Sequence, residues 1–302
     1  MKKETKGMLV GFAGIVIFAL TLPATRYAIT YLDPVFVGLG RSVMAALVAG
    51  MLLWIFKAPI PTKSQFVQLT IVALGVVIGF PLFSALAMTT LSAVHGGVVV
   101  GVLPMATAIA GVLLTRERPS LGFWLTGIAG CLVVLRFAYP QGGFQAVLAG
   151  DVFLACAIVS AAFAYVLGAR LSIALGGWQV ICWALVLAFP FVLIPTGMQW
   201  PSSTQHIPIT AWLCFIYLAL GSQLLGFVFW YKGLTLGGIV RVSQIQLLQP
   251  FITLMAAALL LGEQLDGRTL FFALLVVAVV GLGRRMSVRC AAPLIIDNRS
   301  HK

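Results

Sequence analysis

Polar side chains recur at helical spacing within the apolar stretch 239–261. Ser243, Gln246, Gln249 and Thr253 follow one another at intervals of three, three and four residues. In an α-helix this spacing brings all four side chains to one face. Such a stripe of amides and hydroxyls either lines a cavity for a polar ligand or hydrogen-bonds to a neighbouring helix. The sequence leaves both interpretations open, and the four residues are candidate substrate-binding groups.

Two further apolar stretches carry polar or aromatic side chains on a shared helical face. In 210–231 they are Gln223, Trp230 and Tyr231, and in 8–29 they are Thr21 and Thr25. An amide beside amphipathic rings suits a pocket for a flat or zwitterionic metabolite. The alternative for the rings is the core or the aromatic belt at a membrane interface.

Arg41 is the sharpest single candidate for a functional charge. It stands seven residues into the apolar stretch 34–56, which puts it about 10 Å below the boundary at 1.5 Å per residue. A charge at that depth costs about 2.5–3.5 kcal/mol unless it pairs or reaches water. We expect either an ion pair or a role as a gate or carboxylate contact. The acids expected at the same side are Asp33, Asp151, Glu263 and Asp266.

Glu117, Glu263, Pro104 and Pro250 mark helix ends and interruptions. We expect each glutamate at the end of an apolar stretch, paired to nearby basic residues or acting in a gate. Each proline removes a backbone hydrogen bond in mid-span and predicts a kink.

Motifs for catalysis and for cofactors are absent from the sequence. It contains no HExxH, GxSxG or P-loop pattern, and His95, His206 and His301 are isolated from one another. The five cysteines have no CxxC spacing, and four of them lie in apolar runs. We therefore expect no enzyme activity, no cofactor and no metal site.

The composition sets the class of protein in which these residues act. Of 302 residues, 61% are hydrophobic and 9% are charged, with a mean hydropathy of +1.10. Soluble domains have about 25% charged residues. The composition excludes a soluble globule, a disordered chain and a nucleic-acid-binding protein, despite the net charge of +12.

Ten apolar stretches are long enough, at roughly 20 residues, to cross a bilayer. They cover residues 8–29, 34–56, 67–89, 93–114, 121–138, 151–169, 178–197, 210–231, 239–261 and 268–285. With the N-terminus inside, fifteen basic residues fall on the cytoplasmic side and three, Arg26, Arg136 and Arg268, on the other. The positive-inside rule then predicts that both termini are cytoplasmic.

An internal repeat relates the two halves of the chain. A shift of 146 residues aligns Pro104 with Pro250, Thr107 with Thr253, and Glu117 with Glu263. A shift of 144 aligns Arg26 with Arg170. Because each half has five stretches, an odd number, the second half must enter the membrane from the opposite side. The fold class we predict is an all-α membrane protein with ten transmembrane helices in two inverted five-helix repeats. The first repeat covers 1–140, the second covers 141–286, and a cytoplasmic tail covers 287–302.

The run Leu32-Asp33-Pro34, Arg41 in the next stretch, and the segments Pro104 to Glu117 and Pro250 to Glu263 resemble the drug/metabolite transporter superfamily. The resemblance is to its EamA-type members with ten helices and spans about residues 8 to 286. It implies transport of small metabolites, often export, from a site near the bilayer midplane.

Together these observations predict a multi-pass secondary transporter of the bacterial inner membrane that works by alternating access as a monomer or homodimer. Its expected substrates are small polar metabolites such as amino acids or their derivatives, moved outward. The alternatives are an uptake permease for sugars or nucleotide-linked metabolites and, with less support from the motifs, a membrane-embedded enzyme. The expected partners are the small-molecule substrate and the lipid bilayer, with no nucleic acid.

Overall fold

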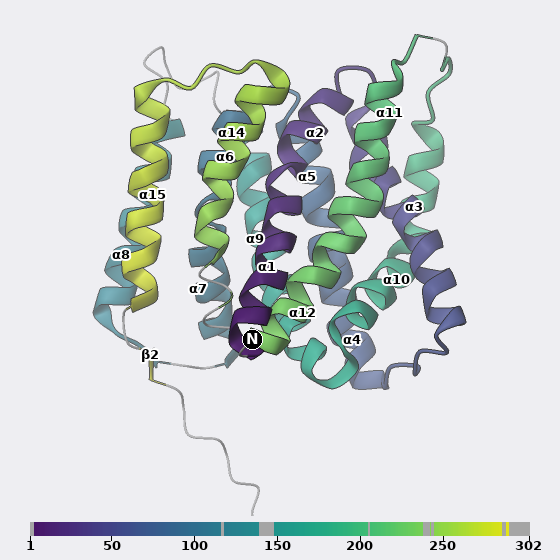
Figure 1. Ribbon diagram of the computed structural model, residues 1–302, viewed down its shortest axis with the longest axis horizontal. Helices are drawn as coiled ribbons and strands as arrows, with labels where there is room; N and C mark the ends of the chain where they lie inside the picture. The colour runs from purple at the N-terminus through teal and green to yellow at the C-terminus, as the bar shows by residue number, and fades with distance from the viewer. Residues whose placement is uncertain are drawn as a thin grey trace, which may run out of the picture.

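The chain folds into a bundle of apolar helices in a computed structural model (Figure 1). The structure describes residues 3–115, 118–138, 148–204, 206–237, 242, 245–285 and 288–289. Within these ranges the regular structure is helical, apart from two strands of two residues each.

The first half of the chain contains eight α-helices and one π-helical segment. In chain order they are α1 (Lys3–Ala19), α2 (Thr21–Ala28), α3 (Pro34–Ile55), α4 (Lys63–Val72), η1 (Ala73–Gly79), α5 (Phe80–Ala87), α6 (Ala93–Val100), α7 (Leu103–Thr115) and α8 (Leu121–Ala138). Strand β1 (Arg118–Pro119) lies between α7 and α8.

The second half has a corresponding series. Its helices are α9 (Leu148–Leu175), α10 (Gly177–Met198), α11 (Ile209–Ile216), η2 (Tyr217–Gly226), α12 (Phe227–Gly237), η3 (Gln246–Leu248), α14 (Gln249–Leu261) and α15 (Gly267–Arg285). Strand β2 (Val288–Arg289) pairs antiparallel with β1, which ties the segment after α15 to the α7–α8 connection.

Seven of the described helices are long and apolar enough to cross a membrane. They cover Thr5–Ala28, Pro34–Ile55, Lys63–Ala87, Ala93–Leu114, Ala149–Leu175, Gly177–Met198 and Ile209–Gly237. Three shorter apolar helices cover Trp124–Val134, Gln246–Leu261 and Gly267–Leu282. Each of these ten segments overlaps one of the ten stretches expected from the sequence. The α9 helix extends beyond its expected range at both ends.

Short polar residues fix where several helices begin. Asp33 caps α3, because its Oδ1 accepts the backbone N–H groups of Val35 and Phe36 at 2.7 and 3.1 Å. Thr62 and Gln65 form a capping box at the start of α4. At the other end of the chain, α14 stops at Gly262, whose positive φ of 67° is the left-handed conformation of a helix C-terminus.

Both π-helical segments occur at equivalent positions of the sequence repeat. A shift of 146 residues moves η1 (Ala73–Gly79) onto positions 219–225, which lie inside η2 (Tyr217–Gly226). In a π-helix the hydrogen bonds run from i to i+5, so side chains can reach backbone carbonyls that an α-helix would use internally. Both segments pack in the middle of the bundle, where side chains of other helices bind the carbonyls of η1.

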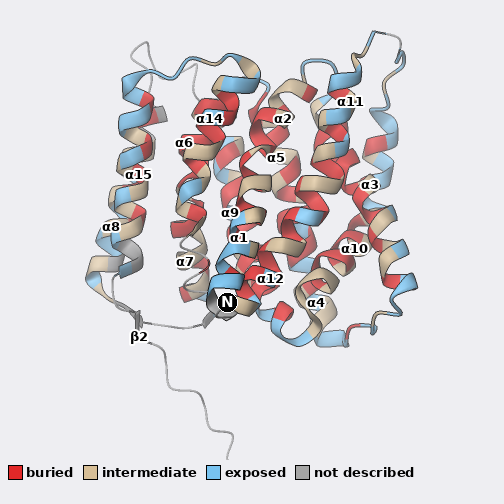
Figure 2. Cartoon of the chain, in the orientation of Figure 1, coloured by how far each residue is buried: buried red, intermediate tan, exposed pale blue. Residues whose placement is uncertain are grey.

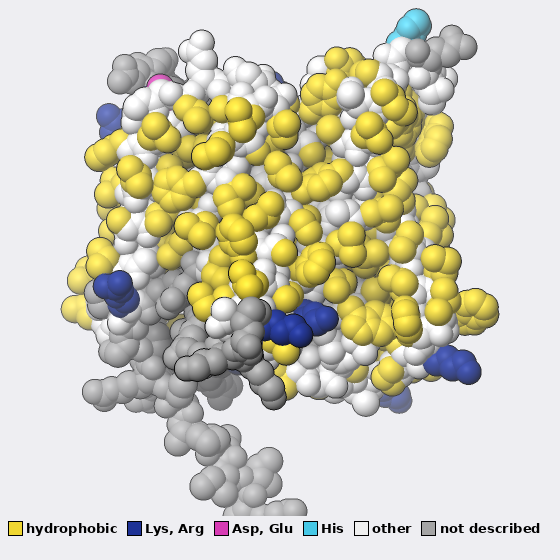
Figure 3. Space-filling view, in the orientation of Figure 1, with side chains coloured by type: hydrophobic (Ala, Val, Ile, Leu, Met, Phe, Trp, Pro, Cys, Tyr) yellow, Lys and Arg dark blue, Asp and Glu magenta, His cyan; other side chains and the backbone are white. Residues whose placement is uncertain are grey.

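Burial divides the bundle into a buried centre and an apolar periphery. Buried residues concentrate in the middle of the molecule (Figure 2), and seven of the eight residues of α6 are buried. Many apolar side chains are exposed, such as Trp54 and Leu259 at 81% and 78%, and hydrophobic side chains cover much of the face seen in Figure 3. An apolar patch of this extent on a folded chain marks contact with lipid rather than water.

Close contacts between backbones hold neighbouring helices together. The α1 and α12 helices touch at Gly11 and Gly233, where a Cβ on Gly233 would lie 2.6 Å from the Gly11 Cα. The η1 segment touches α9 in the same way, because a Cβ on Gly79 would lie 2.8 Å from the Ser160 Cβ. Small residues at these points let helices approach at distances that larger side chains would prevent.

Candidate functional site

A narrow cavity lies at the centre of the bundle, and we call it the central cavity. It is lined by side chains from both halves of the chain: Phe18, Thr21, Arg41, Val76, Phe80, Leu103, Tyr165, Ser222, Gln223, Phe227 and Gln249. The space within it that is open to the centre of a water molecule is about 20 Å³, which is room for one or two waters in this conformation. An apolar wall with a few convergent polar groups is typical of small-molecule sites.

The π-helical segments position the polar side of the central cavity. Gln223 of η2 donates its Nε2–H to the backbone carbonyl of Val76 in η1 at 2.7 Å. Ser42 of α3 donates to the next carbonyl, that of Val77, at 2.7 Å. Both acceptors belong to η1, so the carbonyls of this segment bind side chains from two other helices.

Hydroxyl groups and aromatic rings complete the lining. The Oγ1 of Thr21 and the Oγ of Ser222 lie 2.8 Å apart in a buried hydrogen bond between α2 and η2. The Phe227 ring packs against Phe18 and Tyr165, with ring centroids 4.9 and 6.0 Å apart. The lining therefore combines packed aromatic rings with a small set of hydrogen-bonding groups.

Arg41 brings a positive charge to this lining. Its side chain is 1% exposed, and its Nε and Nη1 have no hydrogen-bond partner among the described residues. It is also the only charged side chain that is buried in the part of the chain that the structure describes. A guanidinium with free donors at a cavity wall is poised to bind an acceptor from a ligand.

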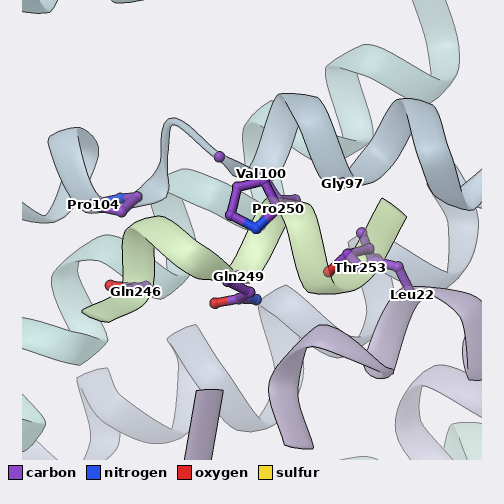
Figure 4. A pocket seen from close by; sticks show the side chains of 9 residues that line it. Leu22, Gly97, Val100, Pro104, Gln246, Gln249, Pro250 and Thr253 are labelled. Atoms are coloured by element: carbon purple, nitrogen blue, oxygen red, sulfur yellow. The ribbon is translucent and has the colours of Figure 1, made fainter. Parts of the chain in front are cut away.

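A second, smaller cavity lies beside the first, between the two prolines, and we call it the proline cavity. Its lining is Leu22, Gly97, Val100, Gly101, Pro104, Gln246, Gln249, Pro250 and Thr253. Pro104 and Pro250 are the second residues of α7 and α14, where the missing N–H costs little because it would be unpaired anyway. Figure 4 shows Pro250 facing α6, with the Gln249 amide on another side of α14.

Gln249 belongs to the linings of both cavities, so its amide stands at the boundary between them. Gln246 is 3% exposed, and its Nε2 has no hydrogen-bond partner among the described residues. Thr253 differs from both, since its hydroxyl donates to the Ala19 carbonyl at the end of α1 at 2.9 Å.

Comparison with known proteins identifies the chain's relatives. Residues 5–137 and 148–282 each match the EamA-like transporter family. The chain belongs to this family. It is therefore a multi-pass membrane transporter, and the cavities lie inside its transmembrane bundle.

Named relatives agree with this assignment. The uncharacterized transporter YdeK of Bacillus subtilis (strain 168) is 44% identical over 287 residues, which cover 95% of this chain and 100% of YdeK. The uncharacterized transporter YyaM of the same organism is 24% identical, with 82% of this chain and 83% of YyaM covered. The protein PecM of Dickeya dadantii (strain 3937) is 28% identical, with 64% and 69% covered.

A solved crystal structure shares the fold. It aligns with a TM-score of 0.64 over 92% of this chain and 96% of its own, at 16% sequence identity. At that identity the likeness concerns the arrangement of helices alone.

Most of the candidate residues of this EamA-like transporter line one of the two cavities. Thr21, Arg41 and Gln223 line the central cavity, Gln249 lines both cavities, and Gln246, Thr253, Pro104 and Pro250 line the proline cavity. Ser243 and Glu117 lie outside the described residues. Thr25 is buried and belongs to the lining of neither cavity.

The expected face of Gln223, Trp230 and Tyr231 is divided in the structure. Gln223 and Phe227 line the central cavity, whereas Trp230 and Tyr231 are buried in the core and line neither cavity. Trp230 and Tyr231 follow Phe227 by three and four residues in α12, so they share its face but lie one turn further along the helix. The Phe227 and Tyr231 rings are in contact, with centroids 5.6 Å apart.

Among the described residues, the four acidic side chains considered as partners for Arg41 bind other groups instead. Asp33 caps α3, Asp151 contacts the His95 Nε2 at 2.8 Å, and Asp266 accepts from the Thr269 backbone N–H at 2.8 Å. Glu263 also departs from its expected pairing with basic residues. Its two carboxylate oxygens accept the backbone N–H groups of Ala93 and Val94, at 2.9 and 2.7 Å, at the start of α6.

Tyr165, Phe80 and Ser222 of the central lining were not among the candidates expected from the sequence. Each belongs to an apolar stretch and shows no stripe of polar neighbours. The internal repeat carries a usable signal, since a shift of 146 residues relates Ser222 to Val76 and a shift of 144 relates Tyr165 to Thr21. All four of these residues line the central cavity.

Proposed function

We propose that this EamA-like protein is a secondary transporter that exports small polar metabolites, such as amino acids or their derivatives, by alternating access. In this proposal, ten transmembrane helices form two inverted five-helix halves, residues 1–140 and 141–286, followed by a cytoplasmic tail, residues 287–302. The substrate binds in the central cavity, at the contact between the halves.

The observation that carries the proposal is the make-up of the central lining. Residues related by the sequence repeat meet there: Val76 with Ser222, and Leu103 with Gln249. A site between two inverted repeats is the arrangement from which many secondary transporters alternate their access. In both pairs the second half supplies the polar partner.

Further support for two inverted halves comes from the family comparison and the helices. The family matches twice, over 5–137 and over 148–282. Elements η1 and η2 occur at equivalent repeat positions. The start of α1 and the end of α15 lie at the same end of the bundle (Figure 1), as an even number of crossings requires.

The distribution of basic side chains supports the orientation that we propose for the protein in the membrane. Most of the basic side chains visible in Figure 3 lie along the edge of the molecule that carries the N-terminus. The positive-inside rule assigns that edge to the cytoplasm of a bacterial inner membrane. We propose that the protein works there as a monomer or homodimer, with both termini inside.

The chemistry of the lining argues for polar, non-cationic substrates. Amide and hydroxyl groups from Gln223, Gln249 and Thr21 offer both donors and acceptors. The lining contains no carboxylate among the described residues, and a site for lipophilic cations would need such a counter-charge.

Close helix contacts offer a route for the conformational change. The small residues Gly79 and Ser160 lie at the contact between η1 and α9, and Gly97 brings α6 against Thr253 of α14. We propose that these contacts let the halves rock against each other around the central cavity. The change in access requires no chemistry beyond binding.

The test is transport by purified protein in liposomes against a panel of amino acids, sugars and organic cations. We expect counterflow of amino acids or related metabolites, and export when the gradient is imposed from the cytoplasmic face. Leu259→Ala, a change on the exposed apolar surface, serves as a control that should keep wild-type flux. Absence of flux for every compound in the panel would reject the proposed function.

A further inference from the structure

Arg41 is buried without a compensating partner for its positive charge among the described residues. A fully buried guanidinium loses its hydration and is tolerated when paired with an opposite charge and fully hydrogen-bonded. Here the Nε and Nη1 groups find no partner among the described residues. The side chain nevertheless lies in the wall of the central cavity.

The carboxylates available to Arg41 are already engaged. Asp33 and Asp266 cap helices by binding backbone N–H groups. Asp151 binds His95, and Glu263 binds the start of α6 with both oxygens. Because each of these groups has a local use, the positive charge at the cavity is left for a molecule that enters it.

The repeat shows that this charge has no counterpart in the second half. Shifts of 144 and 146 residues relate Arg41 to Leu185 and Leu187 of α10. The site therefore has one charged end, on α3. The Gln223 amide is oriented by its bond to Val76, and its carbonyl oxygen makes no hydrogen bond to the described residues. Aromatic rings from Phe18, Tyr165 and Phe227 occupy the remaining wall.

We propose that Arg41 recognises a substrate carboxylate, so that the transported metabolite is a small carboxylic acid with an apolar body. This inference rests on the proposed function and names the substrate class of that site. The planar guanidinium offers donors that match a carboxylate bidentately. The aromatic wall contacts the apolar body, and the free Gln223 oxygen accepts from an ammonium when the substrate is an amino acid.

The first experiment leaves the protein unchanged and alters the ligand. Counterflow in proteoliposomes compares phenylalanine with its carboxamide, with phenethylamine and with phenylpyruvate, and leucine with its carboxamide. We expect transport of the two amino acids and the keto acid, and at least about tenfold less of the amides and the amine, because a site built for a charged partner rejects its neutral analogue. Equal transport of acid and carboxamide would overturn the proposal.

Whether the ammonium group contributes is read from the same panel. Both phenylalanine and phenylpyruvate should exchange if the carboxylate is the shared recognition element. Transport confined to phenethylamine or to the sugars of the wider panel would reject the role of Arg41 while leaving the transporter function intact. No flux of any compound would instead count against the proposed function itself.

The second experiment changes the arginine. Arg41→Gln should reduce carboxylate flux by at least about tenfold and lower the preference for acid over carboxamide by a similar factor. Arg41→Lys keeps the charge but loses the planar fork, so it should retain part of the flux. Elution as a monodisperse species in detergent shows that each variant is folded, and Leu259→Ala is the matched control. A folded Arg41→Gln protein with unchanged flux and selectivity would contradict the proposal.

Discussion

At the scale of the residue, polar side chains on the same helix face have different partners. Thr253 is bonded to the Ala19 carbonyl, whereas the amide nitrogen of Gln246 has no partner among the described residues. Gln249, three residues along, borders both cavities. Helix contact therefore accounts for Thr253, and ligand binding stays a proposal for Gln246 and Gln249.

Gln249→Leu should lose at least about tenfold in transport while the protein still reaches the membrane, because a leucine of similar size fills the lining but cannot hydrogen-bond. Gln246→Leu should also lose transport while the protein still reaches the membrane, because Gln246 lines the proline cavity. Flux in proteoliposomes and the amount of folded protein are measured in parallel. A loss of folded protein in proportion to the loss of flux would show that these amides hold helices together instead.

Thr253→Val should show the opposite pattern. The change removes the hydrogen bond to Ala19 at nearly constant volume and should cost about 1 kcal/mol of stability. Thermal unfolding in detergent measures this loss, and flux per folded molecule should stay close to that of the wild type. A normal melting temperature with lost flux would mean that the hydroxyl binds substrate.

At the scale of the element, helix ends decide where the acidic residues go. Four carboxylates were candidates for Arg41, and three of them cap helices while Asp151 contacts His95. Hydrogen bonds from Thr269 to Asp266 lower the pKa of that carboxyl below its usual range, so it is ionised and acts as a cap. A cap satisfies N–H groups that would otherwise be unpaired at the start of a helix.

Glu263→Ala should destabilise the contact between the α14–α15 connection and the start of α6. It removes two charge-assisted hydrogen bonds and a favourable interaction with the helix dipole, with an expected cost of about 1–2 kcal/mol. Thermal unfolding of the purified variant checks the loss. Glu263→Gln should recover part of the stability, since an amide oxygen still accepts one N–H group. Equal stability of Glu263→Ala and the wild type would show that the cap is dispensable.

At the scale of the whole molecule, the distribution of charge predicts how the bundle sits in the membrane. The α10–α11 connection, residues 199–208, lies at the end of the molecule opposite the N-terminus (Figure 1). The charge bias assigns that end to the outside.

A single cysteine at Ser203, in a variant whose five native cysteines are replaced, should react with an impermeant maleimide added to intact cells. Cysteines added at either terminus should react after the cells are permeabilised. A cysteine at Gly142, which lies outside the described residues, should behave like that at Ser203. Labelling of Ser203→Cys from the cytoplasmic side alone would contradict the proposed orientation.

Hydropathy alone predicts a membrane protein with long apolar helices, because it adds up along a local stretch and needs no knowledge of neighbours. The sequence also placed Thr21, Arg41, Gln223 and Gln249 among the candidates, since polar groups are costly at membrane depth and therefore conspicuous. The repeat of prolines and glutamates was visible in the same way.

Which of these groups share a cavity and which bind elsewhere depends on how the helices pack against one another. Trp230 and Tyr231 lie one turn beyond Phe227 in α12 and are buried in the core, whereas Gln223 and Phe227 line the cavity. The partners of Arg41, Asp151 and Glu263 depend on helices far apart in the sequence, as in the contact between Glu263 and Ala93. Helical periodicity is set by neighbouring residues, whereas the pairing of charges is set by which helices pack together, and a local pattern contains no information on that choice.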